Sequence, residues 1–265
     1  MISPKKPWTI VGKSIDWGCQ PFEWLAFKDL VRRDKATGYN FYCPFSSPGL
    51  TKPLWTGNSK GEPFEDRASL KWNRKYWDNI RDRYMYAWEV GGITCGNGEG
   101  FADSRMFHNS TVNWEALKDH VKRECEAFMD MSTIWIMGGE VEEGGSKAVA
   151  KALELCAIAK SICAPDPVGF HSVNCNEKWV GRGIDWISIQ ENGSLDMRRL
   201  KKLRDKHPNI PILIMENRKC NDSQIVSNLR GAHALGCTCI VGSKNFGTES
   251  EWLRGQIQEF SSEVS

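Results

Sequence analysis

The chain has 265 residues and a formal net charge of +2, and its 35 basic and 33 acidic residues are interleaved. This length fits one large domain or two small ones, while the mixed charge gives neither the basic stripe of a nucleic-acid-binding protein nor an acidic tail. No run approaches the roughly 18 apolar residues that a membrane span needs, so neither nucleic acid nor a membrane is expected as a partner.

The first residues contain Lys5 and Lys6, but the apolar segment of a secretory signal peptide does not follow them. We therefore expect no signal peptide in this chain. The protein would then be cytoplasmic, or it would leave the cell by a non-classical route such as phage lysis.

Short apolar runs that indicate strands alternate along the chain with amphipathic segments that indicate helices. The expected strands are residues 8–15, 39–44, 93–95, 133–140, 168–172, 184–190, 212–216 and 237–241. The expected helices are residues 23–37, 74–90, 114–131, 147–163, 195–207, 222–235 and 249–260, with a short helical piece near Trp179. We expect Gly38 and Gly236 to end helices, and Asn113 and Ser146 to cap helix N-termini.

Eight strand–helix pairs in a chain of this size predict an α/β fold, a single (β/α)8 TIM barrel over residues 1–265. A doubly wound parallel sheet is the alternative. It usually carries a glycine-rich phosphate loop after its first strand, and the segment 16–19 is not such a loop.

The ten cysteines are scattered and include no C-x-x-C pair. We expect most of them to be reduced, buried and apolar in character, and neither a disulfide framework nor a zinc site is predicted. Among the twelve tryptophans, Trp88 and Trp135 lie in apolar segments and are expected in the core. The loop residues Trp17, Trp55 and Trp179 are candidates for stacking on sugar rings, since their faces offer a large apolar area.

Two apolar runs each stop at a glutamate: residues 133–140 end at Glu140, and residues 210–216 end at Glu216. A continuous apolar run is typical of a buried parallel strand, so both carboxylates would lie at the carboxyl ends of strands, where a barrel builds its active site. Two such carboxylates are what glycoside hydrolysis requires. As alternatives, Glu140 could belong to a solvated acidic loop with its neighbours, and Glu216 could form a salt bridge at a strand end.

Further polar residues follow the expected strands, and they are candidates for binding sugar hydroxyl groups: Asp16, His171, Asn174 and Gln190. An amide both donates and accepts hydrogen bonds, which suits hydroxyl groups, although Gln190 could equally anchor a loop and His171 could be structural. The long segments 45–72 and 96–111 exceed ordinary connections, and we expect them to wall a substrate cleft.

With these residues the chain resembles the glycoside hydrolase clan A barrels, which use an acid/base residue on strand four and a nucleophile on strand seven. Within that clan it is most similar to the apiosidase-like (DUF4038) family. The resemblance rests on residues 134–140, Phe170-His171, residues 185–190 and Glu216, and it covers about residues 134–252. That family usually has Asp where this chain has Glu140, and the Asn-Glu pair of the wider clan is Gly139-Glu140 here.

The resemblance implies a retaining glycoside hydrolase that cleaves O-glycosidic bonds in a poly- or oligosaccharide, with Glu140 as acid/base and Glu216 as nucleophile. It requires no metal and no organic cofactor. Two alternatives remain open: a carbohydrate-binding barrel without hydrolysis, and a Schiff-base or phosphate-binding barrel, for which Lys244 is the candidate residue. The sugar, the linkage and the oligomeric state do not follow from the sequence.

Overall fold

The computed structural model describes residues 11–15, 23–44, 60–66, 68–97, 113–190, 193–215, 220–241 and 249–264. Within these ranges eight strands form one sheet in the order β7-β6-β5-β2-β1-β10-β9-β8, and all neighbours in it are parallel. The strands are β1 (Val11–Ile15), β2 (Phe41–Pro44), β5 (Thr94–Asn97), β6 (Ser132–Ile136), β7 (Val168–Gly169), β8 (Ile187–Gln190), β9 (Ile212–Met215) and β10 (Thr238–Val241).

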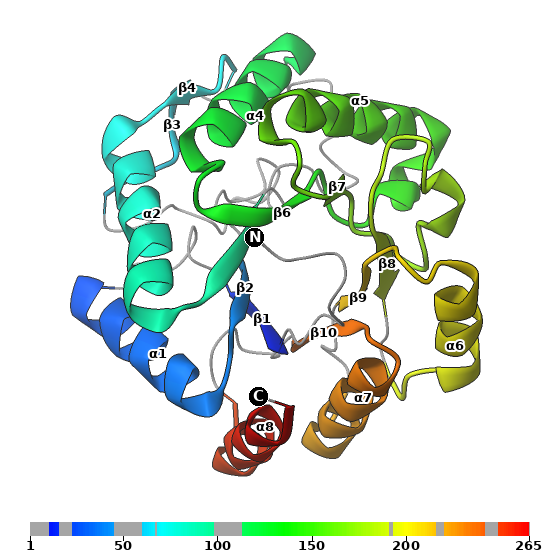
Figure 1. Cartoon of the computed structure of the whole chain (residues 1–265). Helices are drawn as coiled ribbons and strands as arrows, with labels where there is room; N and C mark the ends of the chain where they lie inside the picture. The colour runs from blue at the N-terminus through cyan, green and yellow to red at the C-terminus, as the bar shows by residue number, and fades with distance from the viewer. Residues whose placement is uncertain are drawn as a thin grey trace.

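Helices alternate with these strands, as the sequence predicts, and Figure 1 shows the strands around a central axis with the helices outside them. The helices are α1 (Trp24–Thr37), α2 (Arg74–Tyr86), α4 (Trp114–Phe128), α5 (Gly145–Cys163), α6 (Met197–Lys206), α7 (Asp222–Ala234) and α8 (Glu251–Val264). None of the described helices is long and apolar enough to cross a membrane. The mixed α/β arrangement with a parallel sheet is consistent with a TIM barrel.

The predicted helix ends are confirmed at Gly38 and Asn113 and wrong at Ser146, while Gly236 follows the last turn of α7 in the left-handed conformation at φ 64°. Gly38 ends α1 in the left-handed conformation at φ 99°, and the Asn113 side chain accepts from the backbone N–H of Glu115 at the start of α4. Ser146, by contrast, does not cap α5, because a short 3-10 helix, η2 (Val141–Gly144), leads directly into it. Ser146 therefore already lies inside the first helical turn.

Side chains that alternate along the strands divide the core into an inner and an outer layer. The inner layer is a small buried cluster: Phe41, Cys43, Ile134, Ile136, Trp186, Leu213 and Met215. Gly169 leaves room for the Trp186 ring, since a Cβ at that position would lie 2.7 Å from Cε2 of the indole. The residues between the inner ones, such as Tyr42, Trp135 and Ile214, pack outward against the helices.

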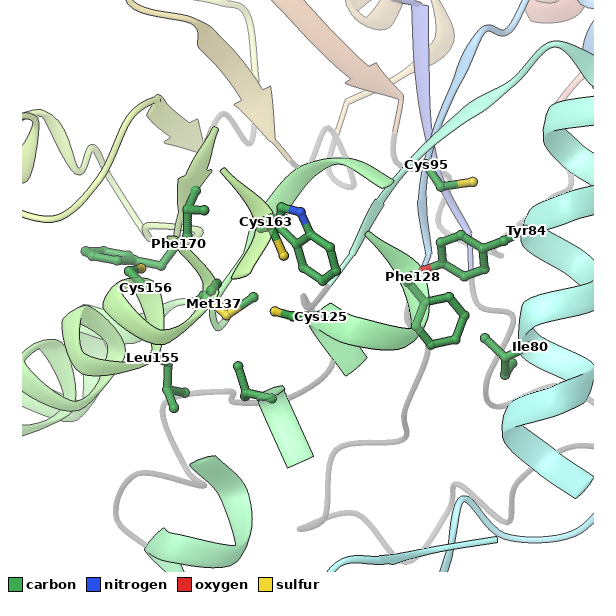
Figure 2. Packing of buried hydrophobic residues seen from close by; sticks show 14 of the residues in the cluster. Ile80, Tyr84, Cys95, Cys125, Phe128, Met137, Leu155, Cys156, Cys163 and Phe170 are labelled. Carbon is green, nitrogen blue, oxygen red and sulfur yellow. The ribbon is translucent and has the colours of Figure 1, made fainter. Parts of the chain in front are cut away.

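Several of the cysteines lie in the outer layer of the core. Figure 2 shows Cys95, Cys125, Cys156 and Cys163 among apolar side chains from β5, α4 and α5. The pKa of the Cys125 thiol is raised by its hydrogen bond with Cys163 and by burial. The nine described cysteines are free, as predicted, and Cys19 lies outside the described residues.

The prediction that Trp88 belongs to the core is wrong, because its side chain is 52% exposed. After Tyr86 the helix widens into a π-helical turn, η1 (Ala87–Gly91). Ala87 and Gly91 take the inward positions of this turn, and a Cβ on Gly91 would lie 3.0 Å from the Val31 side chain. The change in helical geometry therefore turns Trp88 toward solvent, whereas Trp135 is buried as expected.

The two ends of the sheet, β7 and β8, are joined by individual hydrogen bonds. The backbone N–H of Asp185 donates to the Val168 carbonyl at 2.8 Å, and the Asp185 carboxylate accepts from the Val168 N–H at 3.1 Å. The buried Asn176 side chain makes two further bonds. Its Oδ1 accepts from the Ser188 N–H at 2.7 Å, and its Nδ2 donates to the Phe170 carbonyl at 2.8 Å. We call these contacts the β7–β8 seam.

A small hairpin, β3 (Phe64–Asp66) and β4 (Lys71–Trp72), occupies the second half of the long segment 45–72. It packs against the outside of the helices: Trp77 Nε1 of α2 donates to the Pro63 carbonyl at 2.8 Å, and Trp72 Nε1 donates to His120 Nδ1 of α4 at 2.7 Å. This part of the segment therefore supports the helices. Residues 45–59 and 98–111, which carry most of the rest of the predicted cleft walls, lie outside the described residues.

The seam can be tested at Asp185, which bonds both the Val168 N–H and Lys160 Nζ, the latter at 2.6 Å. Asp185→Ala leaves a buried backbone N–H without its acceptor, so we expect it to lower the free energy of unfolding by about 1–2 kcal/mol. Asp185→Asn keeps an oxygen acceptor and loses only a partly exposed ion pair, which costs less than about 1 kcal/mol. Urea unfolding measures both, and equal losses would contradict the role of the seam.

His120 gives a pH-dependent prediction. Burial lowers the pKa of this imidazole from 6.5 to about 3. Glu124 Oε2 lies 3.4 Å from Nε2 and would favour the charged form. The geometry opposes this, because Nδ1 already accepts from the Trp72 N–H and a proton there would face another donor.

Since the unfolded chain binds this proton at higher pH than the folded protein, the stabilising contribution is complete above pH 6.5 and is lost progressively as the pH falls toward about 3. His120→Gln removes the titration but keeps an acceptor for Trp72. We therefore expect the free energy of unfolding of the parent protein to fall more steeply than that of the variant in this window. Parallel profiles in chemical denaturation would show that His120 is not held neutral.

Candidate functional site

Glu140 lies just beyond the carboxyl end of β6 and has an unusual backbone conformation. Its φ and ψ are 49° and 38°, in the left-handed region, which costs a residue with a side chain about 1–2 kcal/mol. Gly138, two residues earlier, has φ 113°, a value that glycine adopts readily. The Gly-Gly-Glu sequence therefore lets the chain turn sharply after the strand, and backbone strain of this kind is concentrated at functional sites.

The turn that carries Glu140 is fastened to the segment after β7. The His171 N–H donates to the Gly138 carbonyl at 2.9 Å, and the Val141 N–H donates to the His171 carbonyl at 3.4 Å. The His171 side chain is buried, at 1% exposure. The predicted residue His171 is thus next to Glu140 in space, and its backbone hydrogen bonds fix the position of the turn that carries Glu140.

Gln190 is the last residue of β8, and its side chain contacts Glu140, so the end of a third strand lies beside the ends of β6 and β7. The Gln190 Nε2 atom donates to Oε1 of Glu140 at 3.2 Å, and the Gln190 backbone N–H donates to the Asn174 carbonyl at 3.4 Å. Gln190 pairs in register with Met215, the residue immediately before Glu216. The structure therefore joins Glu140, His171, Asn174 and Gln190, which the sequence places on strand ends as far as 50 residues apart.

The idea that Glu140, Glu142 and Glu143 form one solvated acidic loop does not hold. Glu140 is partly buried and bonded to Gln190. Glu142 accepts from the Ser172 hydroxyl group and from the Val173 N–H at 3.3 Å, so it anchors the loop after β7. Glu143 alone of the three is exposed, which leaves the Glu140 carboxylate as the one directed to the shared strand ends.

Trp179 lies in a 3-10 turn, η3 (Glu177–Trp179), as predicted. It packs edge-on against Phe170 with ring centroids 5.2 Å apart, and Lys178 Nζ lies 4.1 Å from its ring centroid. The half-buried indole also lines a groove of about 550 Å³ together with Val149, Ala150 and Leu153 of α5. This setting agrees with a partly exposed aromatic platform.

A larger groove, of about 910 Å³, was not predicted from the sequence. It lies between the segment after β7 and α6, whose lining residues run along the helix as far as its last residue, Lys206, and it also contains Glu142 and Asn174. The signal in the sequence was the basic amphipathic character of residues 195–207. That pattern did not tell which of the charges would gather beside the strand ends.

Several predicted residues lie outside the described residues: Asp16, Trp17, Trp55, Glu216 and Lys244. The separation of the Glu140 and Glu216 carboxyl groups is therefore still a prediction. Among the described residues no group of three or more His, Cys, Asp or Glu side chains is arranged to hold a metal ion.

Several glycoside hydrolases of solved structure are similar to this chain in fold. No protein-family model matches the chain, and no curated protein sequence matches it. A family 5 glycoside hydrolase from Bacteroides vulgatus superposes with a TM-score of 0.66 at 14% identity, over 88% of this chain and 58% of that one. The present chain therefore spans less than two thirds of that protein.

Other neighbours match over nearly their whole length, and two of them are a mannanase and an endoglucanase. An endo-1,4-β-D-mannanase from Thermotoga petrophila gives a TM-score of 0.65 at 9% identity, over 96% of this chain and 99% of that one. A broad-specificity endoglucanase from Clostridium longisporum gives 0.63 at 10% identity, over 98% and 97%. At these identities the likeness establishes the shared fold.

The strained conformation of Glu140 gives a prediction that is independent of activity. Glu140→Ala and Glu140→Gly both remove the carboxylate, but only glycine is unstrained at φ 49°. Glycine avoids the strain of about 1–2 kcal/mol but loses more chain entropy on folding than alanine, by about 0.5–1 kcal/mol. We therefore expect Glu140→Gly to be more stable than Glu140→Ala by about 0.5–1 kcal/mol. Urea unfolding of the two variants decides this, and a more stable alanine variant would show that position 140 is not strained.

Proposed function

We propose that residues 1–265 form one (β/α)8-barrel catalytic domain of a retaining glycoside hydrolase, which cleaves O-glycosidic bonds in a poly- or oligosaccharide. The observation that carries the proposal is the Glu140 carboxylate, held in a strained turn after the fourth strand of the barrel, β6, and bonded by Gln190 from the sixth, β8. A (β/α)8 barrel performs its chemistry at the carboxyl ends of its parallel strands, and the Glu140 carboxylate is held in a fixed conformation at that end.

A closed barrel is part of this proposal. The outermost strands of the sheet, β7 and β8, are linked by the main-chain bond between Asp185 and Val168 and by the Asn176 side chain. The fold shared with family 5 enzymes supports the same arrangement. In a closed barrel Glu140, His171 and Gln190 lie on one rim, and Met215 brings the chain to that rim immediately before Glu216.

In the proposed mechanism Glu140 is the acid/base and Glu216 the nucleophile. Glu140 gives its proton to the glycosidic oxygen as the bond from that oxygen to the anomeric carbon breaks. The Glu216 carboxylate bonds to the anomeric carbon, which forms a covalent glycosyl-enzyme ester. Glu140 then takes a proton from water, which attacks the same carbon and releases Glu216. Double displacement requires the two carboxyl groups about 5–5.5 Å apart.

The other residues would bind and orient the sugar. Gln190 donates one N–H to Glu140, which fixes the direction of the carboxyl group, and its amide can also accept from a hydroxyl group. Trp179 offers an apolar face beside the groove that it lines. Asp16, Trp17, Trp55, His171 and Asn174 complete the proposed binding set. The resemblance of residues 134–140 and 185–190 to apiosidase-like barrels supports these roles.

The reaction can be tested with aryl glycosides of common pyranoses and furanoses. Glu140→Ala should slow hydrolysis by about 10²–10⁴-fold for poor leaving groups, and much less for dinitrophenyl glycosides, because these need little protonation. Glu216→Gln should abolish formation of the covalent intermediate. Glu143→Ala, which removes an exposed carboxylate three residues from Glu140, is the matched control and should retain full activity.

Product stereochemistry, followed by NMR, provides the decisive readout. Retention of the anomeric configuration is the expected result. An inverted product would assign a water-activating role to Glu216 and a carboxyl separation of roughly 6.5–9.5 Å. Binding of glycans without hydrolysis in any variant or substrate would favour the alternative of a non-catalytic carbohydrate-binding barrel.

A further inference from the structure

The large groove beside the strand ends carries an excess of positive charge. We call it the basic groove. Its cationic side chains are Lys178, Arg198, Arg199, Lys202 and Lys206. Its three carboxylates are those of Glu142, Glu177 and Asp196. The question is whether these opposite charges neutralise each other or leave cations available to a ligand.

The carboxylates are already engaged with groups of the protein. Glu142 accepts from the Ser172 hydroxyl group and the Val173 N–H. Asp196 caps α6 by accepting from the backbone N–H groups of its first turn, at 3.0 and 3.1 Å. Glu177 is paired with Lys206 at 2.8 Å and with His207 at 2.9 Å, and hydrogen bonds from these two side chains lower its pKa.

The cations differ in their partners: Lys206 is paired with Glu177, Lys178 lies over the Trp179 ring, and Arg199 donates to the Asn174 carbonyl. Over the described part of the chain no carboxylate oxygen lies within 4.0 Å of the charged nitrogens of Arg198 or Lys202, whereas Lys201 on the same helix is paired with Asp205 at 2.7 Å. Both side chains are exposed and both line the groove. Like charges gathered in one groove repel each other, and a bound anion relieves this repulsion.

The basic groove is connected to the proposed active site. The Asn174 carbonyl accepts from Arg199 Nη2 at 3.4 Å and from the Gln190 N–H at 3.4 Å, and Gln190 in turn bonds Glu140. The groove also adjoins the smaller groove lined by Trp179, because Glu142 and Lys178 belong to both. An aromatic platform and a row of cations thus follow each other on the same side of the strand ends.

We propose that the basic groove binds the anionic part of an acidic glycan, so that the substrate of this protein is a sugar chain bearing carboxylate or sulfate groups. The inference rests on the proposed glycoside hydrolase function and adds the charge class of the substrate to it. A sugar ring would stack on Trp179, while acidic groups farther along the chain would contact Arg198 and Lys202. Arginine suits this role because its planar guanidinium forms paired hydrogen bonds with carboxylate and sulfate oxygens.

The test compares two double variants that change the net charge equally. Arg198→Gln/Lys202→Gln removes the two unpaired cations of the groove. Lys122→Gln/Lys201→Gln removes two exposed lysines that pair with Asp119 and Asp205 outside it. Binding is measured in the Glu140→Ala background by affinity electrophoresis in gels that contain polygalacturonate, a sulfated galactan or a neutral glucan. A single-stranded oligonucleotide serves as a non-sugar polyanion.

We expect the groove variant to bind polygalacturonate, the sulfated galactan or both about tenfold more weakly than the parent, with an effect that salt reduces. The glycan that shows the larger loss identifies carboxylate or sulfate as the preferred group. The control variant should bind as the parent does. Equal loss in both variants, no loss in either, or equally tight binding of the oligonucleotide would overturn the proposal.

Hydrolysis of uncharged aryl glycosides separates this inference from the function on which it rests. The groove variant with Glu140 intact should hydrolyse them as fast as the parent, because a small neutral substrate does not reach Arg198 and Lys202. If the parent hydrolyses aryl glycosides but shows no groove-dependent binding of acidic glycans, the enzyme proposal stands and the groove proposal fails. If it binds acidic glycans through the groove but hydrolyses no glycoside, the enzyme proposal fails.

Discussion

The β7–β8 seam is the constraint on which the rest of this molecule depends. β7 has only two residues, so an ordinary ladder cannot hold it against β8, and the Asp185 carboxylate and the buried Asn176 amide supply the missing contacts. Because a buried polar group without a partner is costly, these bonds specify one position for the segment between the strands. That segment carries His171, Asn174 and the partners of Glu142.

The candidate site follows from this constraint through the main chain. His171 fastens the turn after β6 with its backbone, and the turn holds Glu140 in a left-handed conformation. Gln190, one residue beyond the antiparallel bridge between Cys175 and Ile189, then reaches the Glu140 carboxylate. The stability of the seam and the proposed function are therefore coupled, since a loosened seam would also misdirect the proposed acid/base.

Sequence reasoning succeeded where a local signal has one structural meaning. Continuous apolar runs gave the buried strands, and Gly38 and Asn113 marked helix ends because a left-handed cap and an N-cap bond are local features. It failed where geometry several residues away decides the outcome. The π-turn of η1 exposes Trp88, and η2 leads into α5 and displaces the cap from Ser146.

The sequence by itself determined the alternation of strands and helices and the position of Glu140 after a buried strand, because continuous apolar runs mark buried strands and the helical period of apolar residues marks the helices. The tertiary structure alone decided which polar groups meet and which charges remain unpaired. On α6, Arg204 turns inward and donates to five carbonyl groups, whereas Arg198 faces the basic groove. In the sequence these two arginines look alike, and only the packing of α6 against its neighbours separates a structural cation from one that is available to a ligand.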